Sequence, residues 1–232
     1  MLIEKPYQIA KYPVTNLQYR RFVDADGYMK REYWSNDGWA WRDGEYHSLA
    51  STLHEIDRLS RRPLNRHNEP AFWRDLKWNN PLAPIVGVNW FEAEAYCNWL
   101  SCELNKPIRL PYEEEWARAA CHTDGRAYPW GNRFDRFRLN SRDWWGEAEN
   151  EARSTTMVGQ FEGGNSVAGI SDMSGNVWEW TNSWFDDQQR EWVLRGGSWD
   201  GHYYLVHCAV RAGLIPDDFG YLFGFRVCSP SA

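Results

Sequence analysis

Tryptophan is the feature of this sequence that most constrains its fold. The chain has 16 Trp among 232 residues, and aromatic residues make up 16% of it, far above ordinary usage. Many of them stand close together, as Trp144 and Trp145 or Trp178 and Trp180 do. Large rings fill the core of a domain, and each buried indole N–H needs a hydrogen-bond partner. We therefore expect a ring-packed, loop-rich core, with a sugar-stacking surface as the alternative.

Three segments have the pattern of short helices. Residues 14–27 offer Thr15 or Asn16 as N-cap and a glycine as stop. Residues 88–107 contain an asparagine cap with two Glu in the following turn, and residues 109–125 contain a proline followed by three Glu, where the helix dipole favours acidic side chains. The positions expected to face the core are Leu17, Phe22, Val23, Phe91, Ala95, Trp99, Trp116 and Ala120.

The remaining segments show no sustained helical period. Residues 27–84 and 121–170 are rich in Gly, Asn, Asp, Pro and Trp, which predicts long packed loops with short strands. From Val177 onward, runs such as WVLRGGSW and LFGFRV are typical of strands in a small antiparallel sheet.

Composition bounds the class of protein. A chain of 232 residues that is 43% apolar suits a single domain over residues 1–232. The net charge of −6 and the scattered Lys and Arg exclude a nucleic-acid partner. No apolar run is long enough for a membrane segment, and the N-terminus lacks the apolar core of a signal peptide. The five Cys show no zinc spacing, so reduced thiols and a cytoplasmic location are the default, which an upstream domain in a longer protein would change.

Seven sequence words, in a fixed order, carry a family resemblance that spans Tyr7 to Val227. The words are KYPVTNLQYRRFV, PIVGVNWFEAEAYCNWL, IRLPYEEEWARAA, YPWGN, GISDMSGNVWEWTNSW, LRGGSW and GFRV. With these words the chain resembles the formylglycine-generating enzyme, or sulfatase-modifying factor, domain. That resemblance implies an α+β fold, a variant of the C-type lectin fold with a small twisted antiparallel sheet, two or three helices and much irregular loop structure.

The residues that carry catalysis in this family are missing. Its catalytic members hold copper with two closely spaced Cys after the GGS word, because soft thiolates suit Cu(I). This chain has no Cys between Ser198 and Cys208, and Cys208 itself is interpreted as structural. A second branch, the sulfoxide synthases of thiohistidine biosynthesis, binds iron with a His cluster largely from another domain, and no two His lie three or four residues apart here. We expect no copper, no iron and no enzyme activity; a sulfatase-modifying enzyme or accessory domain is the alternative.

Residues 200–223 have an unusual composition. Apart from Cys208, Ala209, Arg211 and Pro216, the segment lacks Trp, Glu, Lys, Gln and Met. The codons of these five types all end in a purine, whereas every residue present can be written with a codon ending in C. Randomising the adenines of AAC codons produces this bias. The segment therefore resembles the variable region of proteins diversified by a diversity-generating retroelement; the alternative is chance plus the low Glu and Lys content of strands.

Diversified residues must point outward, because most random core changes destabilise a fold. We therefore expect residues 200–207, 212–215 and 217–223 to be mostly exposed, with one or two aliphatic side chains in the core. An exposed aromatic patch suits an unknown ligand, with a protein expected, bound by a monomer. The candidate ligand-binding residues are Asp200, Gly201, His202, Tyr203, Tyr204, Leu205, Val206, His207, Val210, Ala212, Gly213, Leu214, Ile215, Asp217, Asp218, Phe219, Gly220, Tyr221, Leu222 and Phe223.

The resemblance also implies structural calcium. The word SDMSGNVWEW would supply the carboxylates of Asp172 and Glu179 and the carbonyls of Gly175 and Val177, a mixed oxygen shell of the kind that hard cations prefer. A second site would use Asn140 and Ser141 with a partner near Asn150, where this chain departs from the family pattern. The alternative is that Asp172 and Glu179 cap turns and bind arginine.

Overall fold

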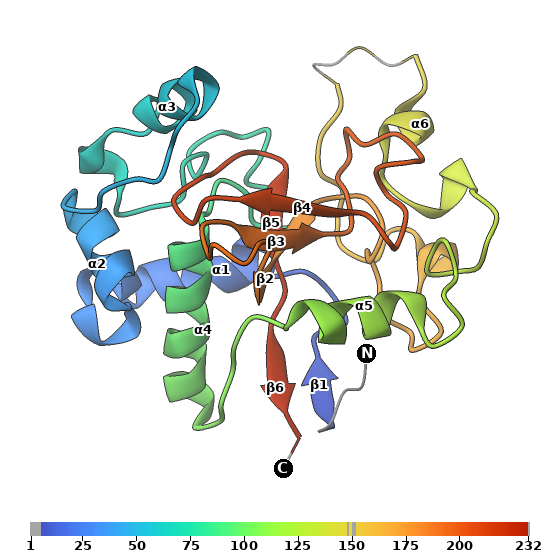
Figure 1. The fold of residues 1–232 in the computed structure, drawn as a ribbon, viewed down its shortest axis with the longest axis horizontal. Helices are drawn as coiled ribbons and strands as arrows, with labels where there is room; N and C mark the ends of the chain where they lie inside the picture. Colours follow the sequence, from blue (N-terminus) through green and yellow to red (C-terminus); the bar gives the residue numbers. More distant parts are fainter. Residues whose placement is uncertain (1–5, 148, 150–151, 232) are drawn as a thin grey trace.

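The computed structural model describes residues 6–147, 149 and 152–231 and shows a central sheet surrounded by short helices and long packed loops (Figure 1). The helices are α1 (Asn16–Asp24), α2 (Asn36–Asp43), α3 (Leu53–Ser60), α4 (Trp90–Leu104), α5 (Glu113–Cys121) and α6 (Arg142–Trp145). The strands are β1 (Tyr7–Ile9), β2 (Trp178–Trp184), β3 (Trp192–Arg195), β4 (Arg211–Leu214), β5 (Phe223–Phe225) and β6 (Cys228–Pro230). The α+β fold class is confirmed. None of the described helices has the length and apolar character needed to cross a membrane.

The three predicted helices are α1, α4 and α5, and their N-terminal signals are confirmed. Thr15 and Asn89 each accept a hydrogen bond from the third backbone N–H of their helix, within a capping box. In α1 one core position is wrong: Leu17 is 49% exposed. Asn16 is buried and donates through its amide to the carbonyls of Trp78 and Asn80, both at 3.0 Å. This polar anchor rotates the helix so that Leu17 faces solvent.

Helices α2, α3 and α6 lie in segments that the sequence predicts as loops and short strands. Ser35 caps α2, and Thr52 caps α3 in a capping box with Glu55. Helix α2 is interrupted by Gly38. Helix α3 has apolar residues at helical spacing, Leu53, Ile56 and Leu59, but it is only eight residues long and buries none of them, so it has no extended period to reveal it.

The main sheet has the strand order β4-β3-β2-β5. Strands β2, β3 and β4 pair antiparallel, but β5 runs parallel to β2, with Trp180 opposite Phe225. The expectation of a wholly antiparallel sheet is therefore wrong at this pair. Strands β4 and β5 run in the same direction at opposite edges, so residues 215–222 must cross over the sheet. A separate antiparallel pair, β1 and β6, holds the two ends of the chain side by side (Figure 1).

The core is built from rings, as predicted. Nine of the 16 Trp are buried, and Trp184 is the one that is exposed by more than a third. Tyr19 stacks on Tyr96 with ring centroids 5.2 Å apart, and Phe225 meets Tyr96 edge-on at 5.4 Å. Aromatic pairs of this kind stabilise the fold by more than the burial of their apolar surface alone.

Candidate functional site

Residues 200–223 run from the GGSW turn through β4 to β5, and the two framework words hold them at both ends. Gly197 has φ +74°, and a Cβ there would lie 2.7 Å from the Leu205 carbonyl oxygen, so the turn requires glycine. Trp199 is 5% exposed and Phe225 is 0% exposed, which confirms that both rings point inward. The GGSW word itself is a turn and not a strand, because β3 ends at Arg195.

One part of the segment is an exposed aromatic loop, residues 200–207. Tyr203, Tyr204 and Leu205 are 52%, 56% and 37% exposed. Tyr203 and Tyr204 meet edge-on with centroids 5.4 Å apart, and His202 stacks on Tyr204 at 5.8 Å. The loop is pinned from below, because Val206 is fully buried and its carbonyl accepts from the Ser174 hydroxyl at 2.5 Å. The exposed rings are therefore carried on a fixed backbone.

The second exposed part is Tyr221, which is 45% exposed. Its ring stacks on Trp78 with centroids 5.2 Å apart and lies 5.9 Å from both Phe72 and Trp199. The Trp199 indole N–H donates to the Tyr221 carbonyl at 3.3 Å. Trp199 thus connects Tyr221 to the start of the 200–207 loop.

Seven of the candidate positions are buried, which corrects the expectation that only one or two would be. Ile215 to Phe219 belong to the crossover above the sheet, Phe223 is in β5, and Val206 packs beside Tyr128 and Leu139. A side chain on the sheet-facing side of a crossover has no route to solvent. The buried positions are Gly201, Val206, Ile215, Asp217, Asp218, Phe219 and Phe223.

Four of the candidates are exposed, and the other nine are partly exposed. Among these nine, Gly213 cannot vary freely, since a Cβ there would lie 2.6 Å from two carbon atoms of the Phe185 ring. The four exposed positions are Tyr203, Tyr204, Leu205 and Tyr221; the partly exposed ones are Asp200, His202, His207, Val210, Ala212, Gly213, Leu214, Gly220 and Leu222.

Asp217 and Asp218 form a buried acidic pair that sequence reasoning placed on the surface. Asp218 binds the Arg58 guanidinium of α3, and Asp217 hydrogen-bonds the Ser48 side chain. Burial raises the pKa of Asp218 to about 7, although Arg58 opposes the shift, and burial also raises the pKa of Asp217. Their role is to hold residues 48–58 against the crossover.

Cys208 is buried, as its structural interpretation requires, and it lies beside Cys121 at the end of α5. The Cys121 thiol donates to the Cys208 carbonyl at 3.7 Å. Hydrogen bonding to the Cys208 side chain lowers the pKa of Cys121. All five cysteines are free thiols, and the 200–207 loop carries none.

Glu179, a predicted calcium ligand, is bound by arginine. Arg226 and Glu179 are both 0% exposed and form a two-pronged ion pair, with N–O distances of 2.6 and 2.7 Å. The Trp116 indole N–H donates to the same carboxylate at 2.7 Å. A calcium ion would share this carboxylate with a buried guanidinium of like charge. Glu179 therefore does not fit calcium in this arrangement, and it matches the arginine-binding alternative.

Three of the other predicted calcium ligands, Asp172, Asn140 and Ser141, also have protein partners. Asp172 accepts from the Gly159 backbone N–H at 2.7 Å, and burial raises its pKa to about 6. The Asn140 side-chain oxygen accepts from Trp145 at 2.8 Å, and Ser141 caps α6. Gly175 and Val177 are buried in the same turn. Asn150 lies outside the described residues. Within the described residues, no group of three or more His, Cys, Asp or Glu side chains could hold a metal ion.

Chelation tests the predicted calcium site, against which the Arg226–Glu179 ion pair argues. Because Arg226 neutralises Glu179, we expect EDTA followed by 1 mM CaCl2 to leave the melting temperature unchanged. A native-state calcium site would instead stabilise the fold by about 2.7 kcal/mol at a hundredfold over its dissociation constant. MgCl2 at the same ionic strength is the control. A rise in melting temperature with calcium alone would show that the ion competes successfully with Arg226.

A mixed sheet flanked by short helices, with a GGSW turn and a buried arginine after GF, defines a protein of the formylglycine-generating-enzyme type. Residues 2–230 match the Sulfatase-modifying factor enzyme 1-like domain. The chain is 32% identical to the "Inactive C-alpha-formylglycine-generating enzyme 2" of Bos taurus, over 97% of this chain and 77% of that protein. The chain belongs to this family.

The chain is also similar to an oxygenase in sequence and to two solved structures in fold. The chain is 31% identical to the hercynine oxygenase of Mycolicibacterium thermoresistibile, over 83% of this chain but 44% of that protein. Among solved structures, PvdO from Pseudomonas aeruginosa superposes with a TM-score of 0.68 and 21% identity over 97% of this chain and 81% of that chain. Treponema denticola variable protein 1 superposes with a TM-score of 0.62 and 19% identity over 97% and 84%. These two structures share the fold.

Proposed function

We propose that this chain is a non-enzymatic ligand-binding member of the family, and that it binds a protein ligand through Tyr203, Tyr204, Leu205 and Tyr221. The observation that carries the proposal is the exposure of these four side chains on a backbone pinned by Gly197, Trp199 and Val206. Rigid tyrosines supply large contact area at low entropic cost. Relatives named as inactive enzymes support a role without catalysis, while the oxygenase relatives keep an enzymatic role as the rival.

We further propose that the exposed part of residues 200–223 is diversified by a retroelement. The composition bias supports this, and so does the shared fold with a protein named as a variable protein. The burial pattern restricts the proposal to the exposed and partly exposed positions. A neighbouring reverse-transcriptase gene with a near-copy of these codons, carrying Asn codons at the exposed positions, would separate diversification from chance.

The enzymatic rival is tested by activity. Incubating the protein with copper and a sulfatase-derived Cys peptide should leave the peptide unmodified, because no Cys pair lies in the 200–207 loop and Cys208 is 2% exposed. Mass spectrometry after aldehyde capture is the measurement, and an active formylglycine-generating enzyme with the same peptide validates the assay. Aldehyde above the no-enzyme background would contradict the binding-protein proposal.

A further inference from the structure

A pocket of about 350 Å³ lies between α3 and residues 219–223. One wall is formed by the chain after β4, and the facing wall comes from α3 and the segment that follows it. Both exposed and buried members of the candidate face line it. The lining residues are His54, Arg58, Arg61, Ala71, Phe72, Phe219, Gly220, Tyr221, Leu222 and Phe223.

The wall of residues 219–223, together with Phe72, is aromatic. The Phe72 ring lies 6.3 Å from Phe219 and 5.9 Å from Tyr221, and Trp78 stacks behind Tyr221. Most of this wall is carbon, so it favours an apolar group of a ligand. Because the rings pack on one another, the wall keeps its shape without a ligand.

The α3 wall is basic. His54, Arg58 and Arg61 line it, in a chain whose net charge is −6. Arg58 reaches Asp218 with one terminal nitrogen, and its Nε is buried with no hydrogen-bond partner among the described residues. Arg61 pairs with Asp57, but the side chains are 71% and 59% exposed, and an ion pair this exposed is worth little. The exposed Arg61 guanidinium therefore retains donors for an anion, and the Arg58 side chain, which is 24% exposed, adds positive charge to the same wall.

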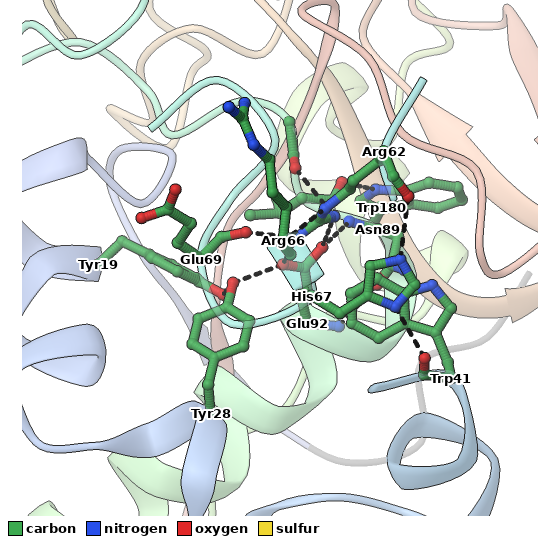
Figure 2. A network of polar contacts seen from close by, with 12 residues as sticks. Tyr19, Tyr28, Trp41, Arg62, Arg66, His67, Glu69, Asn89, Glu92 and Trp180 are labelled. Carbon is green, nitrogen blue, oxygen red and sulfur yellow. Dashed lines mark hydrogen bonds and ion pairs between the residues drawn. The ribbon is translucent and has the colours of Figure 1, made fainter. Parts of the chain in front are cut away.

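A buried polar network holds Arg62, which follows the α3 wall directly in the chain (Figure 2). Arg62, the residue after Arg61, is 5% exposed and binds both carboxylate oxygens of Glu92 at 2.7 and 2.6 Å. Tyr28 donates to the same carboxylate. The Arg62 guanidinium also lies over the Phe219 ring, 5.6 Å from its centroid. Through Arg62, the segment that follows α3 therefore contacts both α4 and the aromatic wall.

We propose that this pocket binds a small amphipathic anion, a carboxylate carried on an aromatic or branched apolar body. The apolar body would pack between Phe72 and Tyr221, and the carboxylate would face Arg58 and Arg61. Charge-assisted hydrogen bonds from arginine to a carboxylate are the strong ones. The volume suits a ligand of about the size of a dipeptide, so the carboxylate belongs either to a free small acid or to the C-terminus of a peptide. The inference rests on the proposed binding role of Tyr221.

The test compares matched acid and amide probes by ligand-observed NMR and isothermal titration calorimetry. N-acetyl-L-phenylalanine should bind at least about tenfold more tightly than N-acetyl-L-phenylalaninamide, because the amide lacks the charge that arginine recognises. Pentapeptides that end in Phe, with a free or an amidated C-terminus, separate the two sources of the carboxylate. If the free peptide binds more tightly than the small acid, the ligand is a peptide end; the reverse order indicates a free acid.

Two variants locate the binding. Arg61→Gln and Phe72→Ala should each lower the affinity for N-acetyl-L-phenylalanine about tenfold or more. Arg133 is exposed and lies outside the pocket lining, so Arg133→Gln should leave this affinity unchanged. Arg58→Gln is informative only if it folds, since Arg58 also neutralises buried Asp218. Equal binding of acid and amide, no binding of either, or an unchanged affinity in Arg61→Gln would overturn the inference. The binding experiments test only the pocket. The proposed non-enzymatic function is tested separately, by the assay for aldehyde formation on the Cys peptide, so failure of one proposal can be told from failure of the other.

Discussion

Replacing Arg226 with Met should destabilise the protein by about 3–5 kcal/mol, because the change leaves the buried Glu179 carboxylate without its counter-ion. Arg226 binds Glu179 with two nitrogens and also donates to the carbonyls of Ala10 and Ser171, both at 2.9 Å. One side chain therefore joins the N-terminal segment, the turn before β2, and β2 itself. Without it, Glu179 would keep Trp116 as its donor while lying near the carboxylate of Asp172.

The measurement is chemical denaturation of wild type and variant at pH 7, with Arg74→Met as the matched control. Arg74 makes an ion pair with Glu69 and its side chain is 80% exposed, so its loss should cost less than about 1 kcal/mol. The double variant Arg226→Met/Glu179→Gln should recover part of the loss, since no charge is then left unpaired. A single Arg226→Met variant as stable as the control would show that Glu179 has another counter-ion, and calcium would then be the first candidate.

The framework of the fold could be predicted from the sequence because its signals are local. Thr15 and Asn89 are capping residues at the first positions of their helices. The GGSW and GFRV words predicted that the rings of Trp199 and Phe225 point into the core, where they lie. Helix α3 carries an equally local signal, the capping box of Thr52 and Glu55. Leu53, Ile56 and Leu59 recur at helical spacing after this cap. The helix has only eight residues, so the loop prediction for residues 27–84 missed a signal that the sequence contains.

The candidate site could be predicted only in part, because its burial depends on topology. Composition indicated residues 200–223, but it could not show that the chain between β4 and β5 crosses the sheet. That crossover buries Ile215, Asp217 and Phe219 and leaves Tyr221 exposed. The pocket illustrates the same limit: its walls come from residues 54–72 and 219–223, which only the folded chain brings together. Asp218 and Arg58, 160 positions apart, form an ion pair for which the sequence offers no signal.

The final prediction separates the recognition surface from the framework. Replacing Tyr203, Tyr204, Leu205 and Tyr221 together with Ser should cost no more than about 2 kcal/mol, since exposed positions usually change stability by about 0.5 kcal/mol each. Phe225→Ala should cost about 3–5 kcal/mol, because it empties an aromatic site that is 0% exposed. Asp217 is excluded from the surface set, since it is 4% exposed and hydrogen-bonds Ser48.

Denaturation curves of the two variants provide the measurement, and Phe137→Ala is the matched control for Phe225→Ala. Phe137 is 70% exposed, so the same chemical change should there stay within about 0.5 kcal/mol. The fourfold variant should also keep a cooperative transition, because Gly197, Val206 and Trp199 pin the loop without help from the exposed rings. If it instead fails to fold, those rings stabilise the domain, and the bias of residues 200–223 reflects packing and not recognition.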